Sequence, residues 1–145
     1  MSTFAHILKG RCRIKERETK RPKKVAAHGL GRTGERLAAE ELIRAGYRIL
    51  ECNFCCRYGE IDLVAEHGHD LVFVEVKTRR GTAYGLPEES VTVHKQRKLI
   101  QTAIFYLDLH GCAERSWRID VVAVQLSTSG KLQEIRIYQH AVTEG

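Results

Sequence analysis

Apolar residues recur along this chain at two spacings, and each spacing predicts a different element. In two segments they recur every three or four residues, which is the period of a helix with one buried face. Elsewhere they alternate with polar residues or form short runs rich in valine and isoleucine, which is typical of strands. The predicted helices are 34–45 and 91–110, and the predicted strands are 47–52, two within 59–77, 117–125 and 134–140. This order predicts an α/β fold in which a central mixed sheet of about five strands is flanked by helices.

Glycine, proline and small polar residues mark the expected boundaries of these elements. Thr33 is expected to cap the first helix, and Gly46 and Gly111 are expected to end the two helices. Residues 53–58 and 81–90 are expected to be loops.

Basic residues are concentrated at the amino end of the chain. The formal net charge is +6, but residues 1–27 alone carry nine bases and two acids, which leaves the remainder near neutrality. We therefore expect a basic, mobile extension over 1–27 and a single folded domain over 28–145. A basic arm fits sequence-independent binding to a polyanion such as nucleic acid, although a solvated tail without a partner explains the charge equally well.

The five cysteines are an odd number, which argues against a disulfide framework and for a reducing, cytoplasmic location. Cys52 and Cys55 have the spacing of half a zinc site, but the sequence offers no second half. The cysteines, Cys112 included with Cys52, Cys55 and Cys56, are therefore expected to be free thiols. No apolar run approaches the roughly 18 residues of a membrane span, so no membrane partner is expected.

The second strand within 59–77 carries charged residues on one face and valines on the other. Because side chains alternate along a strand, Glu75 and Lys77 share a face, while Asp62 lies on the preceding strand. A carboxylate and an amine on an otherwise apolar strand lose hydration, and a partner must compensate for that loss. A metal ion or a network of charges could do so, which makes this strand pair the candidate site.

A third carboxylate, Glu35, is expected in the first turn of the first helix, where the helix dipole alone would favour it. If Glu35, Asp62 and Glu75 converge, repulsion should raise the pKa of at least one of them unless a divalent cation is bound. Oxygen ligands alone suit Mg²⁺, with Mn²⁺ as a substitute, and Lys77 could orient a water molecule beside them. Such a site could hydrolyse phosphodiesters without a nucleophilic side chain. A buried network of ion pairs is the structural alternative.

Five further basic residues lie near the candidate strand in the predicted order of elements. Arg79 and Arg80 follow the strand, where they could clamp phosphate. Lys95, Arg97 and Lys98 open the second helix, where positive charge opposes the helix dipole and a nearby polyanion would compensate. These five residues are the candidate nucleic-acid-binding groups, with an ordinary solvated surface as the alternative.

The spacing of Asp62 and the run Glu75-Val76-Lys77 resembles the D…(D/E)xK core of the PD-(D/E)xK nuclease superfamily. A longer pattern, over roughly residues 28–140, resembles the uncharacterised bacterial YraN family, which is itself similar to archaeal Holliday junction resolvases. The pattern comprises Gly34-Glu35, Asn53, residues 59–63 and 71–77, Gly85, Pro87, Glu88, Lys95, Arg118 and residues 120–122.

The resemblance implies a restriction-endonuclease-like fold. In that fold Asp62 and Glu75 are the metal ligands, Lys77 is the catalytic lysine, and Glu35 supplies a further acid from a helix. The implied function is a Mg²⁺-dependent DNA endonuclease, with branched DNA as a candidate substrate and a homodimer as a candidate assembly. Because nuclease-like domains are also reused for binding, a non-catalytic nucleic-acid-binding module or assembly partner is the alternative.

Overall fold

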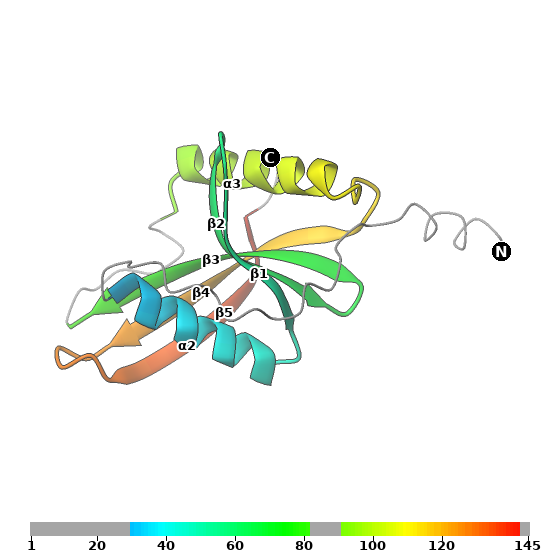
Figure 1. Cartoon of the computed structure of the whole chain (residues 1–145). Helices are drawn as coiled ribbons and strands as arrows, with labels where there is room; N and C mark the ends of the chain where they lie inside the picture. Colours follow the sequence, from blue (N-terminus) through cyan, green and yellow to red (C-terminus); the bar gives the residue numbers. More distant parts are fainter. Residues whose placement is uncertain (1–29, 82–90, 143–145) are drawn as a thin grey trace.

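A computed structural model of the chain describes residues 30–81 and 91–142 (Figure 1). The basic extension expected over 1–27 lies outside these residues, so its boundary with the folded domain stays a prediction. The described elements are α2 (Leu30–Arg44), β1 (Arg48–Cys56), β2 (Gly59–His67), β3 (Asp70–Arg80), α3 (Val93–Leu109), β4 (Trp117–Leu126) and β5 (Leu132–Val142).

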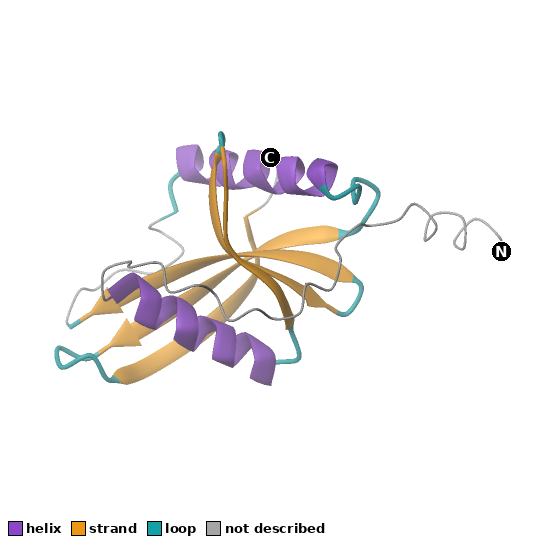
Figure 2. Ribbon diagram, in the orientation of Figure 1, coloured by secondary structure: helices purple, strands orange, loops and turns teal. Residues whose placement is uncertain are grey.

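The five strands form one mixed sheet in the order β1-β2-β3-β4-β5 (Figure 2). Neighbouring strands are antiparallel except for β3 and β4, which are parallel. A parallel pair needs a crossover connection, and α3 lies in the connection between these two strands. The sheet and the helices that flank it confirm the predicted α/β class and are consistent with the restriction-endonuclease-like fold.

The two helices of the described residues cover opposite faces of the sheet, α3 above it and α2 below it in Figure 1. Side chains that alternate along β3 therefore pack into two different cores. Phe73 packs under α3, whereas Val72 and Val74 pack on the α2 side. This alternation confirms the two faces predicted for the strand, and it places Glu75 and Lys77 on the α3 face.

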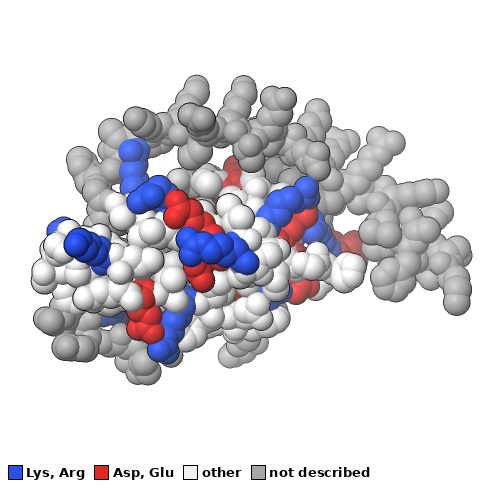
Figure 3. Space-filling model, turned by 90° about the horizontal axis from the view of Figure 1, so that it is seen from below, with Lys and Arg blue, Asp and Glu red and all other residues white. Residues whose placement is uncertain are grey.

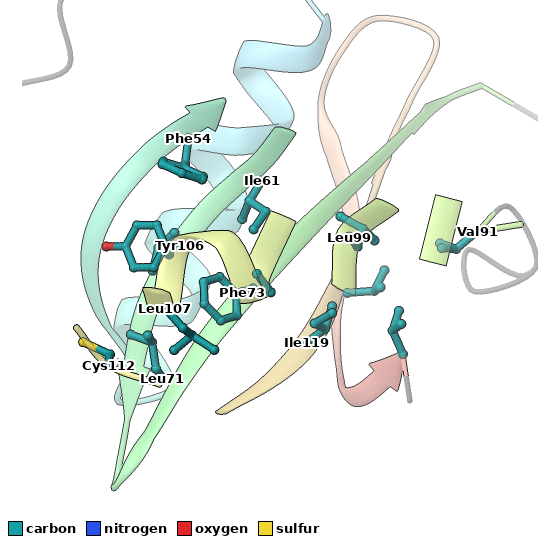
Figure 4. Packing of buried hydrophobic residues seen from close by; sticks show 14 residues of the cluster. Phe54, Ile61, Leu71, Phe73, Val91, Leu99, Tyr106, Leu107, Cys112 and Ile119 are labelled. Atoms are coloured by element: carbon teal, nitrogen blue, oxygen red, sulfur yellow. The ribbon is translucent and has the colours of Figure 1, made fainter. Parts of the chain in front are cut away.

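Aromatic rings fill the space between the sheet and α3 (Figure 4). The ring of Tyr106 on α3 meets Phe54 edge-on at 4.9 Å and Phe73 at 5.5 Å between ring centroids. Such pairs contribute about 0.5–1.5 kcal/mol beyond the area that they bury. This packing holds α3 over the sheet, so the first turn of the helix has a fixed position relative to β3.

Three strands are clearly longer than the sequence predicted: β1, β3 and β5. β1 runs through the expected loop at 53–58 as far as Cys56, because the backbone of Cys55 and Cys56 pairs with Glu60 and Gly59. Asn53 adopts a positive φ of 56° inside the strand, a conformation that asparagine tolerates, so its turn propensity marks an irregularity rather than an end. β3 extends to Arg80, because parallel pairing with β4 continues to that residue.

The first helix begins earlier than predicted. α2 starts at Leu30, so Thr33 lies inside the helix and is not its N-cap. Glu35 consequently lies in the second turn, beyond the part of a helix where the dipole acts strongly. The predicted dipole explanation for Glu35 is therefore wrong. α3 agrees with its predicted helix to within two residues, and its N-cap is Thr92.

A buried polar network closes the end of the sheet near the turn between β2 and β3. The guanidinium of Arg118 binds the carboxylates of Asp120 at 3.0 Å and Asp70 at 2.7 Å. The hydroxyl of Tyr47 donates to Asp120 at 2.8 Å, and the ring of Tyr47 stacks on His67 at 4.1 Å. Among the described residues, no buried side-chain nitrogen or oxygen lacks a hydrogen-bond partner. Arg118 and Asp120 thus have a structural role.

Cys52, Cys55 and Cys56 of β1 are free thiols, as predicted. The prediction is wrong for Cys112, which is not a free thiol. Burial raises the pKa of Cys52, which lowers its reactivity as a nucleophile. None of the helices within 30–81 and 91–142 is long and apolar enough to cross a membrane.

Candidate active site

The candidate site lies where β2 and β3 separate. Backbone pairing between the two strands ends at Leu63 and Val74, and beyond this point β2 continues with β1 alone. The first side chain past the separation is that of Asp62. Its Oδ2 accepts a hydrogen bond of 2.7 Å from the backbone N–H of Val76. The carboxylate of Asp62 thus accepts a hydrogen bond from a backbone N–H of β3 that the backbone of β2 no longer reaches. This hydrogen bond holds Asp62 against β3 at the point where β2 and β3 separate, which we call the fork.

Glu75 is bound by two lysines on the α3 side of the fork. The residue is 7% exposed, and its Oε1 lies 3.2 Å from Nζ of Lys77 and 2.8 Å from Nζ of Lys95. Lys95 belongs to the first turn of α3, where its backbone N–H donates to the hydroxyl of the N-cap Thr92. A buried carboxylate needs such partners because it has lost its hydration.

Glu35 reaches the fork from α2, and its neighbour Gly34 allows the helix to approach. A Cβ at position 34 would lie 1.7 Å from Oγ1 and 2.9 Å from Cβ of Thr78 on β3. Only glycine permits this approach. The carboxyl group of Glu35 lies close enough to the side chains of Asp62 and Asn53 of β1 for both to lower its pKa. The structure therefore brings together the three carboxylates that the sequence predicted to converge.

Crowding raises the proton affinity of these carboxylates. Burial raises the pKa of Asp62 to about 8, and the charges of Glu75 and Glu35 contribute to the rise. Burial also raises the pKa of Glu35, with contributions from Glu75 and Glu60, although its neighbour Asp62 opposes the rise. The prediction that at least one carboxylate has a raised pKa is confirmed. Crowding therefore favours the protonated form of Asp62 in the metal-free protein.

The two lysines differ in their affinity for protons. Burial lowers the pKa of Lys77, and the neighbouring Lys95 lowers it further, whereas the charge of Glu75 opposes this change. Burial alone would lower the pKa of Lys95, but its neighbours Glu75 and Lys77 raise the pKa overall. Lys95 is therefore the cation that is held more firmly in its charged form.

The donor set fits a hard divalent cation in its chemistry. Mg²⁺ and Mn²⁺ prefer oxygen ligands such as carboxylates. The carboxylates at this site take up protons when no cation is bound, which shows that their negative charges are crowded. As they stand, however, no three His, Cys, Asp or Glu side chains of the described residues are arranged to hold an ion. Glu75 faces the lysines, so it would have to change partner to become a ligand beside Asp62.

The structure separates the two arginines predicted to bind nucleic acid after the candidate strand. Both lie within β3, not beyond its end. Arg79 follows Glu75 and Lys77 at every second position, so it shares their face of the sheet. Arg80 takes the opposite face, where its Nε donates to the backbone oxygen of Thr128 at 3.0 Å.

The three basic residues predicted on the second helix also diverge. Lys95 joins the carboxylates through Glu75. Lys98 is exposed one turn further along the same side of α3. Arg97 is exposed and lies about 200° around the helix from Lys95, so it points away from the site.

Sequence reasoning missed the contact between Lys95 and Glu75. It placed Lys95 among the nucleic-acid-binding groups, because neither periodicity nor spacing shows which part of a strand a helix will cover. The one available signal was a base in the first turn of a helix, where the dipole disfavours it.

Comparison with known proteins places these residues in a family. The profile of the Uncharacterised protein family UPF0102 matches residues 34–124, more than half of the chain. The chain belongs to this family. The match contains the three carboxylates, Lys77 and Lys95, and it confirms the predicted membership of an uncharacterised, YraN-type family.

Individual UPF0102 proteins are similar over most of their length. A UPF0102 protein of Symbiobacterium thermophilum is 49% identical over 112 residues, which are 77% of this chain and 94% of the relative. A UPF0102 protein of Syntrophus aciditrophicus is 48% identical over 100 residues, 69% of this chain and 79% of the relative. A UPF0102 protein of Moorella thermoacetica is 44% identical over 111 residues, 77% of this chain and 92% of the relative.

Proposed function

We propose that this protein is a Mg²⁺-dependent DNA endonuclease that hydrolyses phosphodiester bonds. The observation that carries the proposal is the convergence of Glu35, Asp62 and Glu75 at the fork between β2 and β3, with Lys77 beside them. Crowded, buried carboxylates destabilise a fold, so their presence together calls for a functional reason. The resemblance to the PD-(D/E)xK core supplies the class of reaction.

In this proposal Asp62 and Glu75 hold the cation, and Glu35 is the third carboxylate of the set. Mg²⁺, when bound, supplies positive charge at a phosphate oxygen and lowers the pKa of a water molecule. Lys77 shares a face of β3 with Glu75, from which it can orient the attacking water and offset charge that develops on the phosphate. Its lowered pKa also suits it to moving a proton.

Branched DNA of the Holliday-junction type is the substrate that we propose first, because the resemblance to junction resolvases favours it. Two matched nicks in one junction require two sites, so this substrate implies a homodimer. A linear duplex, a flapped duplex and a four-way junction, compared side by side, test the preference.

The decisive assay is cleavage of these three end-labelled DNAs by the purified protein with Mg²⁺ or Mn²⁺. We expect metal-dependent cleavage by the wild type and a loss of at least about 100-fold in rate for Lys77→Met. Lys131→Met is the matched control, because Lys131 is exposed in the turn between β4 and β5, and it should cut like the wild type. The proposal fails if no DNA is cut, or if Lys77→Met cuts as fast as the wild type.

A non-catalytic nucleic-acid-binding module is the second candidate, and the pairing of Glu75 supports it. Lys77 and Lys95 neutralise this carboxylate without a metal, so the cluster could be an ion-pair network only. Calorimetric titration with Mg²⁺ separates the candidates. The enzyme predicts binding that Asp62→Asn removes, whereas the module predicts no binding of Mg²⁺ with or without DNA.

A further inference from the structure

Taking the proposed function one step further, we propose that one strand of the nucleic-acid substrate leaves the carboxylate site along α3 and reaches the turn between β1 and β2. Lys95, Lys98 and Arg57 would bind successive parts of its phosphate backbone. The proposal rests on the proposed function for its starting point, the fork. The direction of the path is inferred from the position of the three cations on the α3 side of the molecule.

Lys95 and Lys98 form a row on α3 that begins at the carboxylates. Residues three apart lie on one side of a helix. The side chain of Lys95 reaches Glu75 and is nevertheless 41% exposed, so its amine lies between the cluster and solvent. Glu75 cannot serve a metal and hold both lysines in this geometry. Lys95 is therefore released to the substrate when Glu75 changes partner, and Lys98 continues the row.

The turn between β1 and β2 continues this row beyond the helix. Figure 1 shows the hairpin of β1 and β2 curling up to the level of α3. A Cβ at Gly59 would lie 3.9 Å from Cβ of Lys98 and 3.2 Å from Oγ1 of Thr102, so the turn packs directly on the helix. The ring of Tyr58 meets that of Phe105 at 5.9 Å between centroids. The turn thus has a fixed position beside Lys98.

Arg57 and Lys98 are exposed, and neither forms an ion pair with an acid of the described residues. The guanidinium of Arg57 lies 4.8 Å from the ring centre of Tyr58, and its Nη2 donates to the hydroxyl of that residue at 2.7 Å. The arginine is therefore held in place by an aromatic neighbour, with its positive charge uncompensated. A phosphate backbone supplies the missing negative charge.

On the α2 side of the molecule, two of the described arginines are held by acids. Arg36 and Arg44 of α2 are each paired with a glutamate of the same helix. Seen from below in Figure 3, basic and acidic side chains are interspersed on this face. Arg36 and Arg44 therefore provide matched controls for the cations on the α3 side.

Binding of a fluorescently labelled duplex and a labelled four-way junction, measured at several salt concentrations with a chelator present, tests the path. Each phosphate contact contributes about 0.9 to the slope of log K against log salt for a duplex, and about 0.7 for a single strand. Lys98→Gln and Arg57→Gln should each lower the slope by about one contact and weaken binding about fivefold at about 0.15 M salt. Arg36→Gln and Arg44→Gln should leave the slope unchanged.

The path is overturned if Lys98→Gln and Arg57→Gln keep the wild-type slope, if the two controls lower it equally, or if the wild type binds neither DNA. Cleavage by the wild type with Mg²⁺ is measured separately on the same DNAs. Cleavage with unchanged slopes would reject the path and keep the nuclease. Lowered slopes without cleavage would keep the path and reject the nuclease.

Discussion

Replacing Asp62 by asparagine should stabilise the metal-free protein at alkaline pH. The asparagine side chain has the same shape, and its carbonyl oxygen can still accept the hydrogen bond from the N–H of Val76. What the substitution removes is a carboxylate that is buried beside Glu75 and Glu35. Asp62→Asn therefore isolates the free-energy cost of ionising this group in the folded protein.

The sign of the effect follows from the raised pKa. In the unfolded chain the aspartate ionises near its ordinary value of 3.8, whereas the folded protein retains the proton up to about pH 8. Between these two values the folded state binds more protons than the unfolded state, so a rise in pH lowers the free energy of unfolding. The loss accumulates across this window and is complete above the folded pKa.

The size of the effect is set by the width of this window. One pKa unit corresponds to about 1.4 kcal/mol, so the change between pH 5 and pH 8 is at most about 3.6 kcal/mol. Relaxation around the charge and penetration of water reduce such costs, and we expect about 1–2 kcal/mol. Domains are typically stable by about 5–15 kcal/mol, so urea unfolding can resolve the difference.

Urea unfolding followed by the fluorescence of Trp117, at pH 5 and pH 8 with a chelator present, measures this difference. Asp62→Asn should gain about 1–2 kcal/mol relative to the wild type between the two pH values. Asp108→Asn, an exposed change on α3, should show no such gain. Parallel pH profiles for the wild type and Asp62→Asn would refute the crowding of carboxylates at the fork.

Three further predictions concern the approach of α2, the buried network and the metal. Gly34→Ala should destabilise the protein by about 1–3 kcal/mol in urea unfolding, because the new Cβ would clash with Thr78, and rotation of the Thr78 side chain cannot move its own Cβ away. Adding Thr78→Ala in the same chain should recover part of the loss. Tyr47→Phe should lower the free energy of unfolding by about 1–3 kcal/mol in the same assay, because the Tyr47 hydroxyl forms hydrogen bonds inside a buried network. Tyr58→Phe should lower it by less, because the hydroxyl of Tyr58 lies in an exposed contact. Mg²⁺ at about tenfold its Kd should raise the free energy of unfolding of the wild type by about 1.4 kcal/mol, and it should stabilise Asp62→Asn by much less.

Much of the fold could be predicted because its signals are local. The alternation of apolar residues in β3 predicted its two faces, and the helical spacing after residue 91 predicted α3. Boundaries were predicted less well, because tertiary pairing overrides local signals. The asparagine at position 53 favours a turn, yet pairing with β2 carries the strand past it. Gly34 weakens a helix, yet close contact with Thr78 requires it there.

The residues of the candidate site also divide into those that local sequence patterns predicted and those that they could not predict. Asp62, Glu75 and Lys77 belong to neighbouring strands, so alternation and spacing sufficed to bring them together. Glu35 comes from a distant helix, and only the resemblance to a nuclease core gave a reason to place it with them. The bond from Lys95 to Glu75 depends on how the aromatic core seats α3 over the sheet, which no local pattern encodes.

Crystals soaked in Mn²⁺ and measured for anomalous scattering would test most directly whether Asp62 and Glu75 form a metal site beside Lys77. We predict an anomalous peak in contact with both carboxylates, with Glu75 turned away from Lys95, and no such peak in Asp62→Asn crystals. A map without a peak at the fork, in which Lys77 and Lys95 still hold Glu75, would contradict the account.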